Sequence, residues 1–330
     1  MDKYTIEYNG QTLVTKNWVP VTEAELLEYK NEYYSKPSLD VVKKQMKKIT
    51  SDGVMIDKIT RYYYRDLMAK VKLNTAKWSV EDVFSSTDLC GIFKAKVLNS
   101  PKVFNPEVSM GYNIERAIAL GGKGYAKVPT QFPFKTADFI YKHYNINNNV
   151  YDFSCGWGVR LLGALKYNIN YYGTDPNDLL CSQLIEMTND YKSVINRTNI
   201  IDIRCQGSEI FIPELENKIG LAFSSPPYFS LEDYKIGKQS WHDGVTYNDW
   251  LENYLYFTLN NIMRYLISNG ILAINIKNTT VPIATDVINY LKGKLTFIET
   301  LELKNIKRLK STGGLTNSTD ELIYIYKKES

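Results

Sequence analysis

The residues with the most evident chemistry are Ser225-Pro226-Pro227-Tyr228, which follow the apolar run 221–223. Proline lacks the N–H group that a strand needs, so we expect the strand to end here in a stiff loop. A serine oxygen and a proline-backed carbonyl could accept both hydrogens of a planar amine, and Tyr228 could stack on the ring that carries it. These groups suit methylation of an exocyclic base amine. A polyproline-type connector or a surface turn remains an open alternative.

A second candidate segment lies upstream, where the strand-like residues 149–151 lead into the segment 152–158 (DFSCGWG) and then into an apolar helical stretch. Strand, glycine turn and helix in this order are typical of nucleotide sites in doubly wound sheets. Gly156 and Gly158 would let the backbone approach a ligand. Asp152, at the end of the strand, could bind a cationic amino group.

Asp175 follows a second strand-like run, residues 171–174. An acid about twenty residues beyond a glycine turn can accept hydrogen bonds from both hydroxyls of a ribose. The same segment, residues 175–178, could instead merely cap the helix that follows it.

In chain order, the glycine turn, the acidic strand end and Ser-Pro-Pro-Tyr resemble the S-adenosylmethionine-dependent DNA amino-methyltransferases over residues 127–280. The resemblance implies S-adenosyl-L-methionine as the cofactor. It implies a catalytic loop formed by Ser225, Pro226, Pro227 and Tyr228. It implies cofactor contacts from Thr130, Phe132, Asp152, Ser154, Cys155, Gly156, Trp157, Gly158, Asp175, Pro176 and Ser208.

The sequence departs from this family in two places. The family usually has Asp-Pro-Phe before its glycine turn where this chain has Asp152-Phe153-Ser154, and Trp157 stands where a small residue is common. Serine at the head of the catalytic loop is similar to the cytosine-N4 enzymes, whereas a glycine turn that precedes the loop is more usual among the adenine-N6 enzymes. Cytosine N4 is therefore favoured over adenine N6, and both remain open.

Cysteines and histidines exclude several other chemistries. None of the four cysteines follows a proline, as the nucleophile of a cytosine-C5 methyltransferase normally does, and they lack Cys-x-x-Cys spacing. The two histidines, His143 and His242, have no partners at metal-ligand spacing, so no metal site is expected. No phosphate-binding Gly-x-x-x-x-Gly-Lys-Ser/Thr segment is present. Scattered cysteines are typical of reduced intracellular thiols.

The composition is compatible with an enzyme of the cytoplasm. The chain has 330 residues, 44% of them hydrophobic, and a net charge of +4. This charge is mild, so affinity for a nucleic-acid backbone would have to come from local basic patches. No apolar run approaches the roughly 18 residues of a membrane span, and the N-terminus is polar. We therefore expect a cytoplasmic protein without a membrane partner.

Residues 1–110 are expected to form a mainly helical region, and residues 111–330 the catalytic domain. Thr22 begins a capping box, and the later helical stretches are rich in lysine (39–48) and in tyrosine flanked by arginine (61–65). Basic side chains among tyrosines favour target recognition by this region, although a solvated helix face over a tyrosine-rich core is equally compatible. The polar insertion 231–247 is a second candidate, as a lid or a groove contact. Its Trp241 and Tyr247 could wedge into the duplex or could pin the loop.

Together these features predict an α/β fold with a Rossmann-like class I methyltransferase sheet. The predicted function is methyl transfer to an exocyclic amine of double-stranded DNA, with the target base flipped out of the helix near Tyr228. Three alternatives remain: an RNA or protein amide methyltransferase, a nicotinamide oxidoreductase, and a non-catalytic DNA-binding protein with a methyltransferase-like fold.

Overall fold

The structure is a computed structural model that describes residues 3–51, 56–119, 125–231, 234, 236–302, 308–309 and 321–330. The chain divides into two compact units. Unit 1 contains Met1–Pro37, Arg65–Thr130 and Glu232–Ile236. Unit 2 contains Ser38–Tyr64, Gln131–Leu231 and Gly237–Ser330.

The elements follow one another along the chain as strands, helices and short turns of helix. They are β1 (Tyr4–Tyr8), β2 (Gln11–Thr15), α1 (Glu23–Tyr34), α2 (Leu39–Lys47), α3 (Asp57–Lys70), α4 (Val80–Val83), α5 (Thr87–Leu98), α6 (Met110–Ala119), α7 (Phe134–Tyr144), β3 (Asn149–Asp152), α8 (Val159–Lys166), β4 (Asn170–Thr174), α9 (Asp178–Val194), β5 (Ile201–Arg204), η1 (Pro213–Leu215), β6 (Ile219–Ser224), η2 (Phe229–Leu231), α10 (Tyr247–Trp250), the π-helical turn η3 (Leu251–Leu255), α11 (Tyr256–Tyr265), β7 (Leu266–Ile276), α12 (Ile283–Leu291), β8 (Thr296–Glu302), β9 (Arg308–Leu309) and β10 (Leu322–Lys327).

Unit 2 is built on one mixed sheet. Among the described residues its strand order is β5-β4-β3-β6-β7-β10-β8-β9. The strands from β5 to β7 are parallel, and β10 pairs antiparallel with both β7 and β8. Strand β6 is buried at every position, as expected for a parallel strand covered on both faces. This architecture confirms the expected α/β, Rossmann-like sheet.

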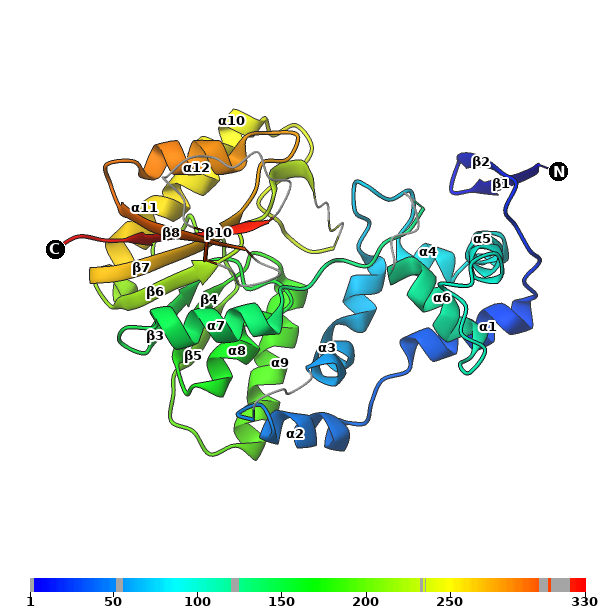
Figure 1. Cartoon of the computed structure of the whole chain (residues 1–330), viewed down its shortest axis with the longest axis horizontal. Helices are drawn as coiled ribbons and strands as arrows, with labels where there is room; N and C mark the ends of the chain where they lie inside the picture. Colours follow the sequence, from blue (N-terminus) through cyan, green and yellow to red (C-terminus); the bar gives the residue numbers. More distant parts are fainter. Residues whose placement is uncertain are drawn as a thin grey trace. The chain divides into compact units, whose positions relative to one another are not determined.

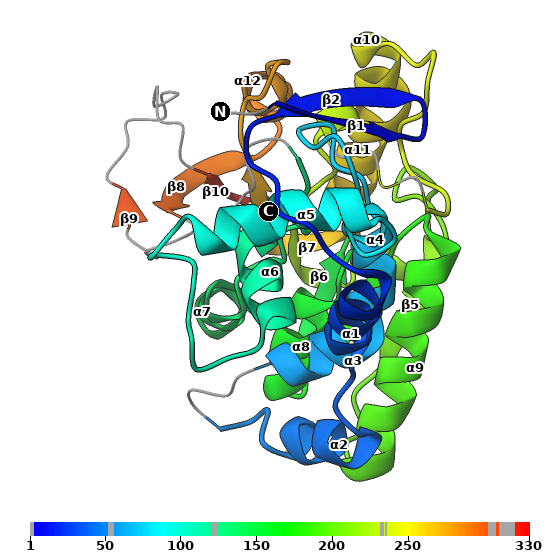
Figure 2. The same ribbon diagram turned by 90° about the vertical axis from the view of Figure 1, so that its right-hand side faces the viewer.

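Helices cover both faces of this sheet (Figure 1). Helices α7, α8 and α9 lie on one side, and α11 and α12 lie on the other. The second side holds a large apolar core, in which Tyr151 and Tyr265 meet edge to face at 5.2 Å. Helix α2 lies beside the C-terminal end of α9 (Figure 2), where Lys43 pairs with Asp190 at 3.4 Å and Tyr63 donates to the same carboxylate at 2.7 Å.

Unit 1 combines a β-hairpin with short helices. Strands β1 and β2 are joined by Asn9 and Gly10, both at positive φ (47° and 73°), which is the geometry of a two-residue hairpin turn. The expected capping box is present at the start of α1, where Thr22 and Glu25 each bond the other's backbone N–H. A core of buried side chains from α1, α4, α5 and α6 holds the unit together. The hairpin is an addition to the mainly helical region that the sequence predicted.

Two boundaries differ from the expectations. The division of the chain does not fall at residue 110: Ser38–Tyr64 belongs to the unit of the sheet, and residues 111–130 belong to unit 1. The sequence of residues 250–266 predicts an amphipathic helix that ends near Asn269-Gly270. Helix α11 instead ends at Tyr265, because β7 already begins at Leu266, which pairs with Ile219. Target recognition by residues 1–110 stays a prediction.

Candidate active site

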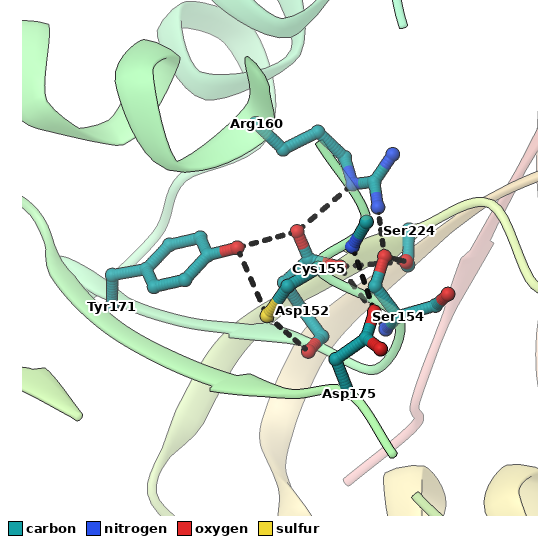
Figure 3. Close-up of polar contacts among 8 residues, drawn as sticks. Asp152, Ser154, Cys155, Arg160, Tyr171, Asp175 and Ser224 are labelled. Carbon is teal, nitrogen blue, oxygen red and sulfur yellow. Dashed lines mark hydrogen bonds and ion pairs between the residues drawn. The ribbon is translucent and has the colours of Figure 1, made fainter. Parts of the chain in front are cut away.

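The predicted site residues converge where the strand order reverses. The chain leaves β3 for β4 and β5 on one side, and returns to β6 on the other side of β3. Because these strands are parallel, Asp152, Thr174 and Ser224 end them at the same edge of the sheet. Open α/β sheets bind their ligands in the crevice outside the carboxyl ends of the strands, at such a reversal. Figure 3 shows the polar contacts at this edge.

The glycine turn has two glycines with different surroundings. Both have positive φ, 51° at Gly156 and 69° at Gly158, which favours residues without a side chain. A Cβ atom on Gly156 would meet only the Ser154 carbonyl, at 3.9 Å. A Cβ atom on Gly158 would lie 2.7 Å from the hydroxyl of Tyr64. Gly156 thus leaves open space for a ligand, and Gly158 permits close packing.

Trp157 lies between these glycines and fills the space beside α3. Its ring is buried and meets Tyr64 edge to face at 6.0 Å. Helix α8 begins directly after the turn, and no side chain caps its N-terminus. The backbone N–H groups of its first turn are therefore available as donors at the positive end of the helix dipole.

Asp152 is fully buried and accepts four hydrogen bonds. Oδ1 receives the Ser224 hydroxyl at 2.6 Å and the Ser154 backbone N–H at 3.2 Å. Oδ2 receives Nε of Arg160 at 2.9 Å and the Tyr171 hydroxyl at 2.6 Å (Figure 3). A ligand's ammonium group could bind this carboxylate only by displacing one of these donors. In this structure Asp152 therefore stabilises the glycine turn through its hydrogen bonds with Ser154 and Arg160.

Arg160 compensates the buried charge of Asp152. Burial alone would lower the pKa of the Arg160 guanidinium, but the adjacent Asp152 carboxylate outweighs this effect and raises the pKa. Arg160 also donates to the carbonyl of Ser154, and its guanidinium lies 5.3 Å from the centre of the Phe132 ring. Cys155 packs within this network, and burial strongly raises the pKa of its thiol. This thiol is therefore protonated at neutral pH and suits packing.

Asp175 follows β4 and faces the glycine turn. Its carboxylate accepts the backbone N–H of Gly156 at 2.9 Å and that of Asn177 at 3.0 Å. Burial nevertheless raises the pKa of the carboxyl group to about 6. The side chain of Asn177, not that of Asp175, caps helix α9 by accepting from Leu179 and Leu180. Within residues 175–178, Asn177 therefore supplies the helix cap. The ribose role of Asp175 stays a prediction.

The segment after β5 contributes a further acidic group. Ser208 is buried and bonds Thr258 at 2.8 Å, and the Ser208 carbonyl accepts from Asn261 at 3.0 Å. Within the described residues, Oε2 of Glu209 is buried without a hydrogen-bond partner. Tyr254, on the π-helical turn η3, lies near Glu209: burial and the carboxylates of Glu209 and Asp175 raise the pKa of its hydroxyl.

The remaining predicted cofactor residues are placed less centrally. Ser154 is half-buried, and its carbonyl accepts the Ser224 hydroxyl at 3.3 Å. Pro176 is half-buried in the turn after Asp175. Phe132 meets Phe223 edge to face at 5.5 Å. Thr130 is an exposed residue of unit 1, and its role stays a prediction.

The Ser-Pro-Pro-Tyr loop leaves the sheet as the prolines predict, since β6 ends at Ser224. Ser225 is half-buried. Tyr228 is only 7% exposed, its hydroxyl donates to Glu321 at 2.9 Å, and the Lys277 ammonium lies 5.8 Å from its ring centre. A base could stack on Tyr228 only after neighbouring groups had moved aside.

Sequence reasoning missed Arg160 and Ser224, which complete the site. Arg160 is a charged residue within the otherwise apolar start of α8, where residues 159 and 161–165 are all buried. A lone cation in such a run indicates a buried ion pair, so this signal was present in the sequence. Ser224 carries no comparable signal, because its partner Asp152 is 72 residues away.

No protein-family model and no curated protein matches this chain. Solved structures give weak similarities. A tRNA methyltransferase of Aquifex aeolicus is 12% identical with a TM-score of 0.40, over 61% of this chain and 72% of that one. An rRNA methylase of Streptococcus thermophilus is 14% identical with a TM-score of 0.39, over 62% and 99%. The N-methyltransferase NodS of Bradyrhizobium japonicum is 13% identical with a TM-score of 0.38, over 60% and 98%. Such likeness carries no information about substrate, so the function must be inferred from the chain's own residues.

Among the described residues, no helix combines the length and the apolar character needed to cross a membrane.

Proposed function

We propose that this protein is an S-adenosylmethionine-dependent methyltransferase that modifies an exocyclic base amine in DNA. One observation carries the proposal. The hydrogen bond between Ser224 and Asp152 joins the strand end before the Ser-Pro-Pro-Tyr loop to the strand end before the glycine turn. The hydrogen bond supports the proposal because the glycine turn and the Ser-Pro-Pro-Tyr loop lie side by side where open sheets bind ligands. The five parallel strands, followed by β8 and β10, agree with the methyltransferase sheet that the resemblance implied.

The residues at this edge fit the proposed cofactor. The open space above Gly156 admits a ligand close to the backbone. Asp175, whose raised pKa reflects a desolvated carboxylate, would gain from the hydroxyl donors of a ribose. The uncapped start of α8 suits the carboxylate of the methionine part. The unpartnered Oε2 of Glu209 would accept a donor such as the amino group of an adenine.

The bound cofactor would supply an electrophilic methyl group on a sulfonium centre. The Ser225 hydroxyl and the Pro226 carbonyl would accept the two hydrogens of the base amine and free its lone pair for attack. The cofactor would supply its methyl group to the amine nitrogen with loss of the carbon–sulfur bond, and the nitrogen would then lose its proton to water. No general base is required. Alignment of the two reactants would provide most of the rate gain, on the order of 7–11 kcal/mol for well-oriented pairs.

We propose DNA as the substrate and cytosine N4 as the preferred atom, with adenine N6 second. The serine at the head of the loop supports this preference. Because the amine lies within a base pair, the base must be flipped out, at a cost of a few kcal/mol. Stacking on Tyr228 requires that this nearly buried ring be uncovered on one face. We therefore expect substrate binding to rearrange the surroundings of Tyr228.

The test is methyl transfer from labelled S-adenosylmethionine to duplex DNA and, separately, to RNA. Digestion and mass analysis of the nucleosides identify the modified atom. N4-methylcytosine or N6-methyladenine in DNA supports the proposal and names the base. Ser225→Ala should lower turnover and leave cofactor affinity nearly unchanged, whereas Asp175→Ala should weaken cofactor binding first.

Each alternative function predicts a different outcome of the same test. Labelled RNA with unlabelled DNA would favour an RNA methyltransferase. Cofactor binding without a labelled nucleoside would favour a protein amide substrate. Preference for a nicotinamide cofactor would favour an oxidoreductase, and absence of any cofactor binding would favour a non-catalytic DNA-binding protein.

A further inference from the structure

Phe229, directly after the Ser-Pro-Pro-Tyr loop, has a backbone conformation that bulky residues rarely adopt. Its φ is 43°, in the left-handed region. The other non-glycine residues with positive φ among the described parts of the chain are all asparagines, which tolerate this region. A glycine would adopt the same φ without strain. The chain has phenylalanine instead, so the surroundings of its ring are of interest.

The Phe229 ring lies among three aromatic side chains: Trp241 and Tyr247 of the insertion that follows the loop, and Trp250 at the end of α10. The distances between ring centres are 5.9 Å to Trp241, 5.5 Å to Tyr247 and 5.7 Å to Trp250. We call these three side chains the aromatic clamp. All four residues belong to unit 2.

Hydrogen bonds hold the aromatic clamp to α12 and to the insertion. The Tyr247 hydroxyl donates to Asp286 on α12 at 2.6 Å. The indole N–H of Trp250 donates to Ser240 at 3.1 Å, and Trp250 is buried. Trp241 and Tyr247 therefore pin the insertion to the loop, the second of the two roles that the sequence left open. An anchored frame around a strained residue is the arrangement expected where structure imposes a local geometry.

We propose that Phe229 is a positioning residue, and that the aromatic clamp holds its ring so that the Ser225–Tyr228 loop keeps the geometry needed to bind the amine. This inference rests on the proposed function. The strained φ turns the chain immediately after Tyr228, so loss of the ring would let the loop relax into a conformation with negative φ. Ser225 and the carbonyl of Pro226 would then no longer converge on one nitrogen.

The test compares variants at Phe229 and at Trp241. Phe229→Ala and Phe229→Gly remove the ring, and Phe229→Tyr keeps it. Trp241→Ala removes one wall of the clamp, and Trp241→Phe keeps a ring but loses the indole N–H, which has no hydrogen-bond partner within the described residues. Phe257→Ala is a matched control, because Phe257 is 54% exposed on α11.

Two readouts are needed. Turnover of methyl transfer should fall by about 100-fold in Phe229→Ala, as expected for a misplacement of about 1 Å. The dissociation constant of S-adenosylmethionine should stay near the wild-type value. Phe229→Tyr should restore most of the turnover, and Phe257→Ala should not change it. Hydrogen exchange of the amides of residues 225 and 228–230 should accelerate in Phe229→Gly and Trp241→Ala, and should stay slow in Phe229→Tyr and Trp241→Phe.

The exchange measurement keeps this inference separate from the proposed function, because it needs no substrate. Unchanged exchange in Phe229→Gly and Trp241→Ala would overturn the clamp even if the wild type methylates DNA. Wild-type turnover in Phe229→Ala would overturn it as well. Hydrogen exchange could accelerate in these two variants even if the wild type methylates no nucleic acid. That result would support the aromatic clamp and refute only the proposed reaction.

Discussion

Ser224 donates its hydroxyl to Oδ1 of Asp152 at 2.6 Å, and both side chains are fully buried. Each residue ends a strand, and the two strands are neighbours in the sheet. The bond therefore fixes the spacing between the glycine turn and the Ser-Pro-Pro-Tyr loop, which begins at the next residue, Ser225. Cofactor binding and amine binding share this support.

Replacing Ser224 with alanine should affect both halves of the site. The Asp152 carboxylate would lose one of four donors in a buried position, which costs about 1–3 kcal/mol of unfolding free energy. Urea denaturation measures this loss. We expect weaker cofactor binding together with lower turnover, whereas Ser225→Ala should lower turnover alone. Equal stability of the Ser224→Ala variant and the wild type would show that the bond does not support the site.

Replacing only one partner of the ion pair between Arg160 and Asp152 should lower the unfolding free energy strongly. Arg160→Met would leave a buried carboxylate without its cation and lower the unfolding free energy by about 3–5 kcal/mol. Adding Asp152→Asn should recover part of this loss, because the unpaired charge is then gone. Urea denaturation of the two single variants and the double variant tests this expectation. Additive losses would contradict the pairing.

The ends of β3 and β6 and the glycine turn between β3 and α8 could be predicted because their signals are local. Apolar strands followed by glycine or by Pro226-Pro227 mark where the backbone must turn, and the structure ends β3 and β6 at these positions. The partners of Asp152 could not be read in the same way. Tyr171 and Ser224 are 19 and 72 residues from it, and only the sheet brings them together. The sequence therefore predicted an acidic residue at the end of β3. It did not predict that the Asp152 carboxylate would be engaged in a buried hydrogen-bond network.

Two other differences concern Asn-Gly pairs. The hairpin at Asn9-Gly10 had a strong signal, since this dipeptide favours a two-residue turn between strands. Asn269-Gly270 resembled a helix end, but Asn269 is instead a positive-φ residue within β7, where its N–H bonds the carbonyl of Lys328. The same residue types serve both structures, so tertiary pairing decides between them.

The two glycines of the turn should respond differently to alanine. Both substitutions force a side chain into the left-handed region, at about 1–2 kcal/mol. Gly158→Ala also places Cβ 2.7 Å from the Tyr64 hydroxyl and 2.8 Å from Leu184, so it should be the more destabilising in thermal unfolding. Tyr64→Phe should relieve part of that excess. Gly156→Ala should instead weaken cofactor binding more than its small stability loss implies, because its Cβ enters the open space.

Asp175 should make both stability and cofactor binding depend on pH. Burial raises its pKa in the folded protein to about 6, above the value of about 3.9 for an unperturbed aspartate. The folded state thus favours the protonated form: the resulting stabilisation is fully present below pH of about 4 and is lost as the pH rises through about 6. At pH 8 and without cofactor, the Asp175→Asn variant should therefore be more stable than the wild type, by up to about 3 kcal/mol. This advantage should vanish near pH 4.

Cofactor affinity should have the opposite dependence on pH. Ribose hydroxyls donate to the carboxylate form of Asp175, so binding should be strongest above pH of about 6 and should weaken by up to about tenfold per pH unit below it. Calorimetric titrations from pH 5 to pH 8 measure this change. Comparing the wild type with Asp175→Asn at each pH cancels the titration of the ligand itself. If the cofactor affinities of the two proteins changed with pH in parallel, protonation of Asp175 would have no effect on binding. That result would contradict the ribose role of Asp175.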